Sequence, residues 1–288
     1  MKIIAVLEQS ILTGGGFNQA FNAIMQMKIL AENRFEFSVV SLNKENIAYL
    51  KRFGVEGGFV KLGMLDKITL LLFESVIFRK LLNKYRIIGT LEKELLKQNC
   101  DLVYFVIPTL RAVMLQQLNY IITVWDLCHR DDLEFPEVRQ FGTFQARETV
   151  YKNVLSPAFA IIVDSERLAE NMVMRYGIDR QRVLPMPYSP SPFINKSESK
   201  SKVNVSNIYS LEHEYFFYPA QFWAHKNHIR IVQALKILKD NHIECKVVFV
   251  GGDKGNMEYV EGRIKEYGLE NQVRLLGFIP PEHMKGLY

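Results

Sequence analysis

The 288-residue sequence has few cysteines, no long apolar run and no large excess of charge of one sign. Its three cysteines, Cys100, Cys128 and Cys245, lie far apart without a C-x-x-C spacing, which argues against a disulfide framework or a zinc site and favours a reducing cytoplasm. No apolar run approaches the roughly 20 residues that cross a bilayer. The N-terminal MKIIAVLEQS has one basic residue and an acidic interruption at Glu8, which is typical of a first strand and not of a signal peptide.

The charge balance favours anionic partners without indicating nucleic acid. Lysines and arginines exceed aspartates and glutamates by 36 − 31, a net charge of +5. This excess suits phosphorylated metabolites or anionic lipid, and it is too thinly spread for a surface that binds duplex nucleic acid. No nucleic-acid partner is therefore expected. The length and an apolar content of 48% provide core for two domains.

Short apolar runs alternate with segments of helical period, a β-α pattern that predicts an α/β fold with doubly wound sheets. Residues 3–7 form a continuous apolar run, as expected for a strand buried on both faces of a parallel sheet. Ser165 predicts a helix N-cap and Gly177 the end of that helix. The expected strands are residues 3–7, 35–42, 101–107, 121–124 and 159–163, and then 215–218, 246–250 and 273–276.

The segment 185–207 predicts a domain boundary. It is rich in serine, holds four of the ten prolines and shows no core periodicity. We predict a first domain over residues 1–188, a linker over 189–212 and a partial second domain over 213–288. The second domain is expected to be incomplete, because its three strands form a parallel sheet that needs cover on both faces.

A glycine turn, TGGGF at residues 13–17, follows the first strand and precedes the first helix. Glycines there allow a ligand to approach the backbone closely, and the free amides of a helix start favour phosphate. Ser41 and Asn43 stand at the end of the second strand instead of a ribose-binding carboxylate, which disfavours a dinucleotide. The alternative is a flexible turn without a ligand.

The loop TVWDLCHRDDLEFPEV, residues 123–138, follows another central strand. Asp126 and His129 lie at the sheet edge where doubly wound folds bind ligands, and histidine is the side chain there that titrates near neutral pH. Trp125 and Phe135 bracket the charges, as in loops that bind sugars or bases. The alternative is a charged surface loop that serves solubility alone.

The stretch YPAQFWAHKNH, residues 218–228, connects an apolar strand to a helix. Lys226 stands at the start of the helix, where a lysine is unfavourable unless an anion such as a diphosphate is also present. In the alternative reading this is a basic turn whose Phe222 and Trp223 fill the gap between strand and helix.

The apolar segment 65–82 has helical period and is followed by basic residues. We favour a helix packed on the sheet with a solvated basic end. A helix lying on an anionic membrane surface is the alternative.

Together these residues resemble the GT-B glycosyltransferases of the large retaining family 4, particularly bacterial members that build surface polysaccharides with hexoses such as mannose. The two most specific runs are IIVDSE, residues 161–166, and YPAQFWAHKNH, residues 218–228. The resemblance also rests on the GGG turn, the loop 123–138, the run AFAIIVDSERLAENMVMRYGIDRQRVLPMP and the closing VRLLGFIPPEHMKGLY.

The resemblance implies two Rossmann-like domains that face each other across a cleft, the first holding the acceptor and the second a nucleotide-sugar donor. It implies that Lys226 contacts the donor diphosphate and that the amides of Gly15 and Gly16 approach the phosphates or the sugar. Trp125 replaces the family's sugar-contacting histidine, which leaves Asp126 and His129 as the catalytic candidates. The further candidate contacts on the donor side are Gln221, which stands where the family often has a basic residue, and His225, His228, Gly251 and Gly252.

The expected activity is retaining transfer of a hexose, with GDP-mannose favoured as donor, to a glycan or a lipid-linked acceptor, without metal or other cofactor. A cytoplasmic location with peripheral contact at the inner membrane face fits that role. The family's glutamate pair would lie beyond Tyr288, so the 288 residues are expected to bind donor weakly. The alternatives are a truncated, non-catalytic binding module that needs a partner chain and, less favoured, a nucleotide-sugar epimerase.

Overall fold

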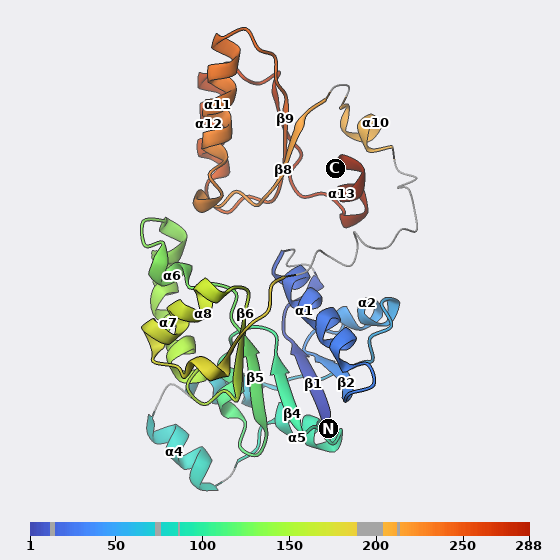
Figure 1. Ribbon diagram of the computed structural model, residues 1–288, viewed down its shortest axis with the longest axis vertical. Helices are drawn as coiled ribbons and strands as arrows, with labels where there is room; N and C mark the ends of the chain where they lie inside the picture. The colour runs from blue at the N-terminus through green and yellow to red at the C-terminus, as the bar shows by residue number, and fades with distance from the viewer. Residues whose placement is uncertain (12–14, 73–75, 86, 189–203, 212–213) are drawn as a thin grey trace. The chain divides into compact units, whose positions relative to one another are not determined.

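The computed structural model describes residues 1–11, 15–72, 76–85, 87–188, 204–211 and 214–288. Figure 1 shows the chain, which divides into two compact units. The first unit is Met1–Asp131 with Phe144–Asn195, and the second is Asp132–Thr143 with Lys196–Tyr288.

The first unit contains a sheet of seven parallel strands in the order β3-β2-β1-β4-β5-β6-β7. The chain runs outward from β1 to β3 and then returns to place β4 on the other side of β1. This reversal makes the carboxyl ends of β1 and β4 the topological switch point, where doubly wound folds bind ligands. The strands are β1 (Lys2–Leu7), β2 (Glu36–Ser41), β3 (Gly57–Phe59), β4 (Leu102–Phe105), β5 (Asn119–Thr123), β6 (Ala160–Val163) and β7 (Val183–Pro185).

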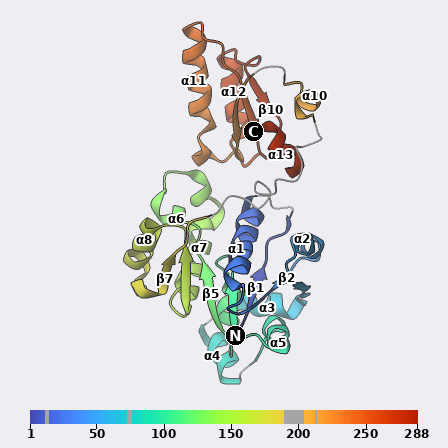
Figure 2. The same cartoon turned by 45° about the vertical axis from the view of Figure 1, so that its right-hand side comes forward.

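Strand β1 is buried on both faces because its apolar run has no polar alternation. Ile3, Ala5 and Leu7 pack into one core, whereas Ile4 and Val6 pack into the other. Helices on the two faces complete these cores, with α1 (Gly15–Ala31) and α2 (Asn46–Arg52) on one side and α7 (Thr143–Val154) and α8 (Glu166–Tyr176) on the other (Figure 1, Figure 2). The other helices described in this unit are α3 (Met64–Leu72), α4 (Val76–Tyr85), α5 (Thr90–Lys97), η2 (Leu110–Met114), α6 (Cys128–Asp131) and η5 (Arg180–Arg182).

The predicted boundaries of α8 are confirmed. The Ser165 hydroxyl accepts a hydrogen bond from the Leu168 amide at 3.3 Å, and Gly177 ends the helix in the left-handed conformation with φ 64°. A cap of this kind satisfies an amide that the first helical turn leaves free, and glycine adopts the left-handed region without a steric penalty.

The second unit is built on three parallel strands in the order β10-β9-β8. Its helices α11 and α12 pack on one face of the sheet, and α10 and α13 supply the core on the other face. Two short helices therefore provide the cover on the second face that the sequence analysis missed. The elements are η3 (Pro136–Val138), η4 (Gln140–Gly142), α10 (Val205–Tyr209), β8 (Phe216–Pro219), η6 (Ala224–Lys226), α11 (His228–Asp240), β9 (Val247–Val250), α12 (Met257–Glu266), β10 (Val273–Leu275) and α13 (Pro281–Leu287).

Two segments differ from the expectation in detail. The predicted linker, residues 189–212, lies largely outside the described residues, but residues 204–211 include α10 and belong to the second unit. The described residues of the apolar segment 65–82 belong to α3 and α4, and no residue of α3 is buried, whereas a helix packed on the sheet was expected. None of the helices in the described residues is long and apolar enough to cross a membrane.

Candidate functional site

The glycine turn of the first unit offers open backbone at the carboxyl end of β1. Helix α1 begins at Gly15, where an added Cβ would meet no atom within 4 Å. A Cβ on Gly16 would meet only the ring of Trp125, at 3.8 Å. Thr13 and Gly14 of the same turn lie outside the described residues. The open space beside Gly15 and Gly16 is what close approach of a ligand requires.

Asp126 follows β5 and is held by its neighbours. Its carboxylate accepts hydrogen bonds from the Arg147 guanidinium at 2.5 Å and from the Cys128 amide at 2.9 Å. Burial raises the pKa of Asp126, but the charge of Arg147 and these hydrogen bonds outweigh burial and lower it. With 42% of its side chain exposed, Asp126 is an accessible, oriented carboxylate.

His129 is in the core, which contradicts its prediction as a catalytic residue. The side chain is 0% exposed, and its Nε2 lies 2.9 Å from Glu148 Oε1 and 3.2 Å from the Tyr176 hydroxyl. Burial, followed by the charge of Arg147, lowers the pKa of His129, so the ring is held neutral. A side chain without exposed surface cannot contact a substrate in this structure; the geometry makes His129 a packing residue.

Glu148, which the sequence analysis did not single out, is the centre of this buried network. Arg130 donates to both of its carboxylate oxygens, at 2.6 and 2.5 Å, and Tyr176 donates at 2.8 Å. Lys152 lies 3.2 Å away. The hydrogen bonds from Arg130 hold the pKa of Glu148 far below its usual range. Its partners come from α6, α7 and α8, so only its i,i+4 spacing from Lys152 was visible in the sequence.

We expect Glu148→Gln to lower the free energy of unfolding by about 2–3 kcal/mol at pH 7, because it removes the buried charge that contacts Arg130, His129, Tyr176 and the exposed Lys152. The folded pKa of Glu148 is depressed, so its contribution is present above the unfolded value of 4.5 and is lost as the pH falls below it. The lowered pKa of His129 also reduces the free energy of unfolding as the pH falls below about 6.5, because the unfolded chain then binds a proton that the buried ring disfavours. Urea unfolding of both proteins across this range measures the effect.

The difference between wild type and Glu148→Gln should shrink below about pH 4.5. A difference that stayed constant down to pH 3.5 would contradict a charge-linked role. Glu166→Gln is the matched control: Glu166 pairs with Arg180 on the surface, with 67% of its side chain exposed. An exposed pair of this kind contributes about 0.5 kcal/mol or less.

Lys226 ends the short helix η6 at the carboxyl end of β8, two residues before α11. Its backbone carbonyl accepts a hydrogen bond from the Tyr218 hydroxyl at 2.8 Å, which ties the turn to the strand. The side chain is exposed, and in the described part of the chain its Nζ has no ion pair or hydrogen bond. An unpaired ammonium is therefore presented at the sheet edge where ligands bind in this type of fold.

Lys254 supplies a second cation in the second unit, and it contacts the ring of Trp223. The Lys254 Nζ lies 5.6 Å from the centroid of the Trp223 ring, within the range of a cation–π contact. Gln221 accepts a hydrogen bond from Trp223 Nε1 at 3.1 Å and orients the ring. Sequence reasoning missed Lys254, because it follows a different strand from Lys226 and no motif links the two.

The two histidines of this segment have different positions. His225 is exposed, and its Nδ1 and backbone amide contact the Glu137 carboxylate of the same unit at 2.5 and 3.1 Å. His228 is fully buried and stacks on the Phe222 ring with centroids 4.2 Å apart. The prediction of His228 as a donor contact is therefore contradicted by its burial, which also lowers its pKa. His225 keeps an exposed face but is already paired.

Gly251 and Gly252 follow β9 and differ in their surroundings. A Cβ on Gly251 would lie 2.2 Å from the Ala220 carbonyl oxygen and 2.8 Å from Gln221 Cα, so this glycine lets two backbone segments approach. A Cβ on Gly252 would meet nothing within 4 Å. Gly251 is thus needed for packing, whereas Gly252 leaves open space beside Phe222, whose amide donates to the Gly252 carbonyl at 3.0 Å.

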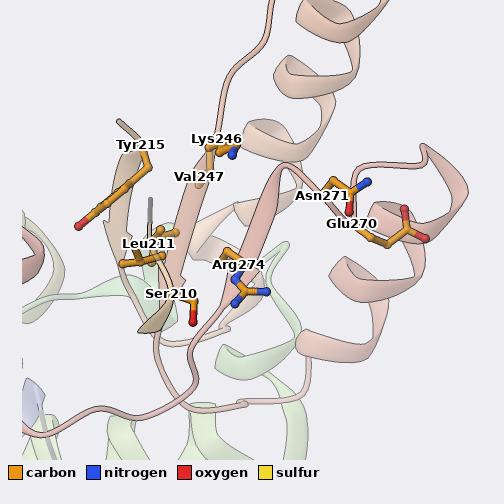
Figure 3. Close-up of a pocket in the computed structure, with 9 residues that line it drawn as sticks. Ser210, Leu211, Tyr215, Lys246, Val247, Glu270, Asn271 and Arg274 are labelled. Atoms are coloured by element: carbon orange, nitrogen blue, oxygen red, sulfur yellow. The ribbon is translucent and has the colours of Figure 1, made fainter. Parts of the chain in front are cut away.

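A cavity of the second unit lies away from this edge. Its volume is about 260 Å³, and it lies at the amino ends of the strands, lined by Lys246, Arg274 and Tyr215 among others (Figure 3). Ligands of doubly wound folds bind at the carboxyl ends. The cavity is therefore separate from the edge that carries Lys226. The described residues contain no group of three or more histidine, cysteine or acidic side chains that could hold a metal ion.

Comparisons with known proteins fit this architecture. Residues 202–288 match the family model described as Glycosyl transferases group 1. No match was found among curated proteins. Among solved structures the chain is similar to a glycosyltransferase from Rickettsia africae, with 14% identity over 99% of this chain and 70% of that chain and a TM-score of 0.62.

Two further solved structures are similar. Anabaena Alr3699/HepE in complex with UDP-glucose is 14% identical over 99% of this chain and 72% of its own, with a TM-score of 0.63. The UDP-GlcNAc 2-epimerase from Methanocaldococcus jannaschii is 13% identical over 100% and 76%, with a TM-score of 0.55. These likenesses define the fold as GT-B, with two Rossmann-like units, as predicted from the sequence.

Proposed function

We propose that the protein is a glycosyltransferase that uses a nucleotide-sugar donor. The observation that carries the proposal is Lys226, which is exposed at the carboxyl edge of the second unit and makes no ion pair with the residues that the structure describes. It lies within the part of the chain that matches the group 1 glycosyl transferases. An accessible cation beside the open backbone of Gly252 suits a diphosphate.

The chemistry needs a cationic edge of this kind. Breaking the bond between a sugar and a nucleoside diphosphate leaves negative charge on the departing phosphate, and preorganised cations and amides stabilise that charge as it develops. Lys226 would contact the diphosphate, and Lys254 with Trp223 would contribute a second cation and an apolar surface. We further propose retention of configuration, with the departing phosphate assisting attack on the same face of the sugar.

The first unit would hold the acceptor, a glycan or a lipid-linked sugar. Gly15 and Gly16 provide open backbone, and Asp126 provides a carboxylate oriented by Arg147 that can accept a hydrogen bond from an acceptor hydroxyl. We expect Asp126→Asn to slow transfer about tenfold or more while donor affinity stays unchanged, because it removes the charged acceptor of that bond.

Initial rates and donor binding, measured on the same Asp126→Asn preparation, separate the two roles. A melting temperature taken in parallel accounts for the lost ion pair with Arg147. Equal losses of donor binding and of rate would contradict an acceptor-side role.

The donor is tested directly by incubating the full 288-residue chain with a panel of nucleotide sugars and detecting transfer by mass. GDP-mannose comes first because of the sequence resemblance, and UDP-glucose because Alr3699/HepE binds it. Transfer to a glycan or lipid-linked acceptor with release of the nucleoside diphosphate is the expected result. Donor binding without turnover would favour the non-catalytic module, and no binding of any donor would reject the proposal.

An epimerase is the second candidate, because UDP-GlcNAc 2-epimerases share the fold. The same assay distinguishes it: an epimerase changes the configuration of the sugar without needing an acceptor. The match of residues 202–288 to the group 1 glycosyl transferases favours transfer.

A further inference from the structure

The cavity of the second unit lies at the amino end of one face of its sheet. Successive side chains of a strand point to opposite faces, so Lys246, Val248 and Val250 share a face of β9. Val248 and Val250 pack there into the core that α10 and α13 complete. Lys246, which precedes the strand, lines the cavity of about 260 Å³ instead. The apolar core of this face therefore ends in a polar cavity.

Arg274 of β10 places a second cation on the same face. It lies opposite Val248 in the parallel register of β9 and β10, and residues paired in this way share a face. Leu276, at the next position of that face, packs into the same core as Val248. Arg274 lines the cavity and is exposed. On both strands a cation at the amino end of this face is thus followed by an apolar residue.

The protein does not neutralise these two cations. Within the described residues Lys246 Nζ and the Arg274 guanidinium make no ion pair and no hydrogen bond. The Glu270 carboxylate lines the same cavity but does not pair with either of them. Lys246 is half-buried, so the surrounding protein limits how far water can screen its charge. Two cations without counter-ions beside a cavity are complementary to a phosphate group.

The other polar groups of the lining suit sugar hydroxyls. Glu270 and Asn271 lie in the turn between α12 and β10, and Ser210 is the residue after α10. Figure 3 shows Tyr215 on one side of the cavity and Glu270 with Asn271 on the other. A carboxylate repels a bare phosphate, but it accepts hydrogen bonds from hydroxyls, and an amide both donates and accepts. The lining therefore favours a ligand that carries hydroxyls as well as phosphate.

We propose that this cavity binds a phosphorylated monosaccharide, with the phosphate at Lys246 and Arg274 and the hydroxyls at Glu270. Its volume of about 260 Å³ is just below the roughly 300 Å³ at which pockets for drug-sized ligands begin, which suits a molecule of this size. The cavity lies at the end of the strands opposite to Lys226, so it is distinct from the proposed donor site. The inference goes beyond the proposed sugar transfer and does not depend on it.

The experiment is calorimetric titration of the full chain with mannose 6-phosphate, mannose and inorganic phosphate. Wild type should bind mannose 6-phosphate about tenfold or more tightly than either of the other two, because its two parts then bind together. Lys246→Gln with Arg274→Gln should weaken this binding about tenfold or more, since both charge-assisted contacts are lost. Neither side chain has a partner within the described residues, so the melting temperature should change by no more than about 3 °C.

Three further variants locate the ligand. Arg230→Gln removes an exposed cation from α11 in the same unit and should bind mannose 6-phosphate as wild type does. Lys226→Ala, at the opposite end of the strands, should also bind it at the wild-type level. Glu270→Gln should lower the preference for mannose 6-phosphate over inorganic phosphate, because it removes both an acceptor for hydroxyls and a charge that repels phosphate.

A wild type that binds mannose 6-phosphate no better than inorganic phosphate, or not at all, would overturn the proposal. Wild-type affinity in the variant that lacks both cations would also overturn it. Loss of binding in Lys226→Ala would assign the ligand to the carboxyl edge and reject the cavity. An unchanged preference in Glu270→Gln would contradict the contact with hydroxyls, and this test stands even if the double variant fails to fold.

Discussion

Lys226→Ala is expected to weaken donor binding about tenfold to a hundredfold and to slow sugar transfer about a hundredfold or more. A charged hydrogen bond contributes about 1.5–3 kcal/mol, which corresponds to the expected loss of donor affinity. The larger loss of rate is expected because Lys226 would stabilise charge that grows in the transition state, and removing one such donor typically lowers the rate by a factor of about 100 or more. The Lys226 side chain is exposed and unpaired within the described residues, so the fold should be unaffected.

The measurement pairs calorimetric titration of the donor with initial rates of transfer. Lys265→Ala is the matched control: Lys265 is an exposed lysine of the same unit in the last turn of α12, whereas Lys226 is at the carboxyl edge. It should leave both quantities at the wild-type level. Wild-type donor affinity and rate in Lys226→Ala would contradict the assignment of the diphosphate to this edge.

Gly251→Ala is expected to destabilise the second unit by about 3 kcal/mol or more, the upper range for overpacking a buried position. The new Cβ would lie 2.2 Å from the Ala220 carbonyl oxygen and 2.6 Å from its carbon. Both atoms are backbone, so neither can turn aside. Relief would require separating the segments after β8 and β9, and with them the turn that presents Lys226. Thermal unfolding should show the second unit melting about 10 °C lower or more.

Gly252→Ala is the control at the neighbouring position. Its Cβ would meet nothing within 4 Å, so the melting temperature should stay within a few degrees of wild type. Where the proposed donor needs the open space beside Gly252, donor binding should fall while stability does not. Equal melting temperatures for the two variants would show that the close approach at Gly251 can relax.

The arrangement of the fold could be predicted from local sequence. The apolar run at residues 3–7 predicted a strand buried on both faces, and the structure places alternate residues of β1 in two cores. Ser165 and Gly177 predicted both ends of α8. These signals were readable because they depend on neighbours within a few residues: strand and helix periods, a capping hydroxyl and a glycine that adopts positive φ.

The candidate site could be predicted only in part. The glycine turn and Lys226 lie at carboxyl edges because a β-α repeat places every strand-to-helix connection there. His129 and His228 belong to the two candidate binding segments, residues 123–138 and 218–228, yet both side chains are fully buried. A histidine in a sequence shows its chemistry but not its exposure, and the exposure depends on partners far along the chain.

The sequence by itself determined the α/β class, eight of the ten strands that the structure describes, and the turns that carry Gly16 and Lys226, because each follows from short-range periodicity. Only the tertiary structure decided which of the candidate side chains reach solvent. Glu148 contacts donors from three helices, Gly251 is required by a contact between two loops, and Asp66 of α3 accepts a hydrogen bond from the Thr90 amide 24 residues away. Burial and partner choice are long-range properties, since they arise from packing between segments that no local pattern links.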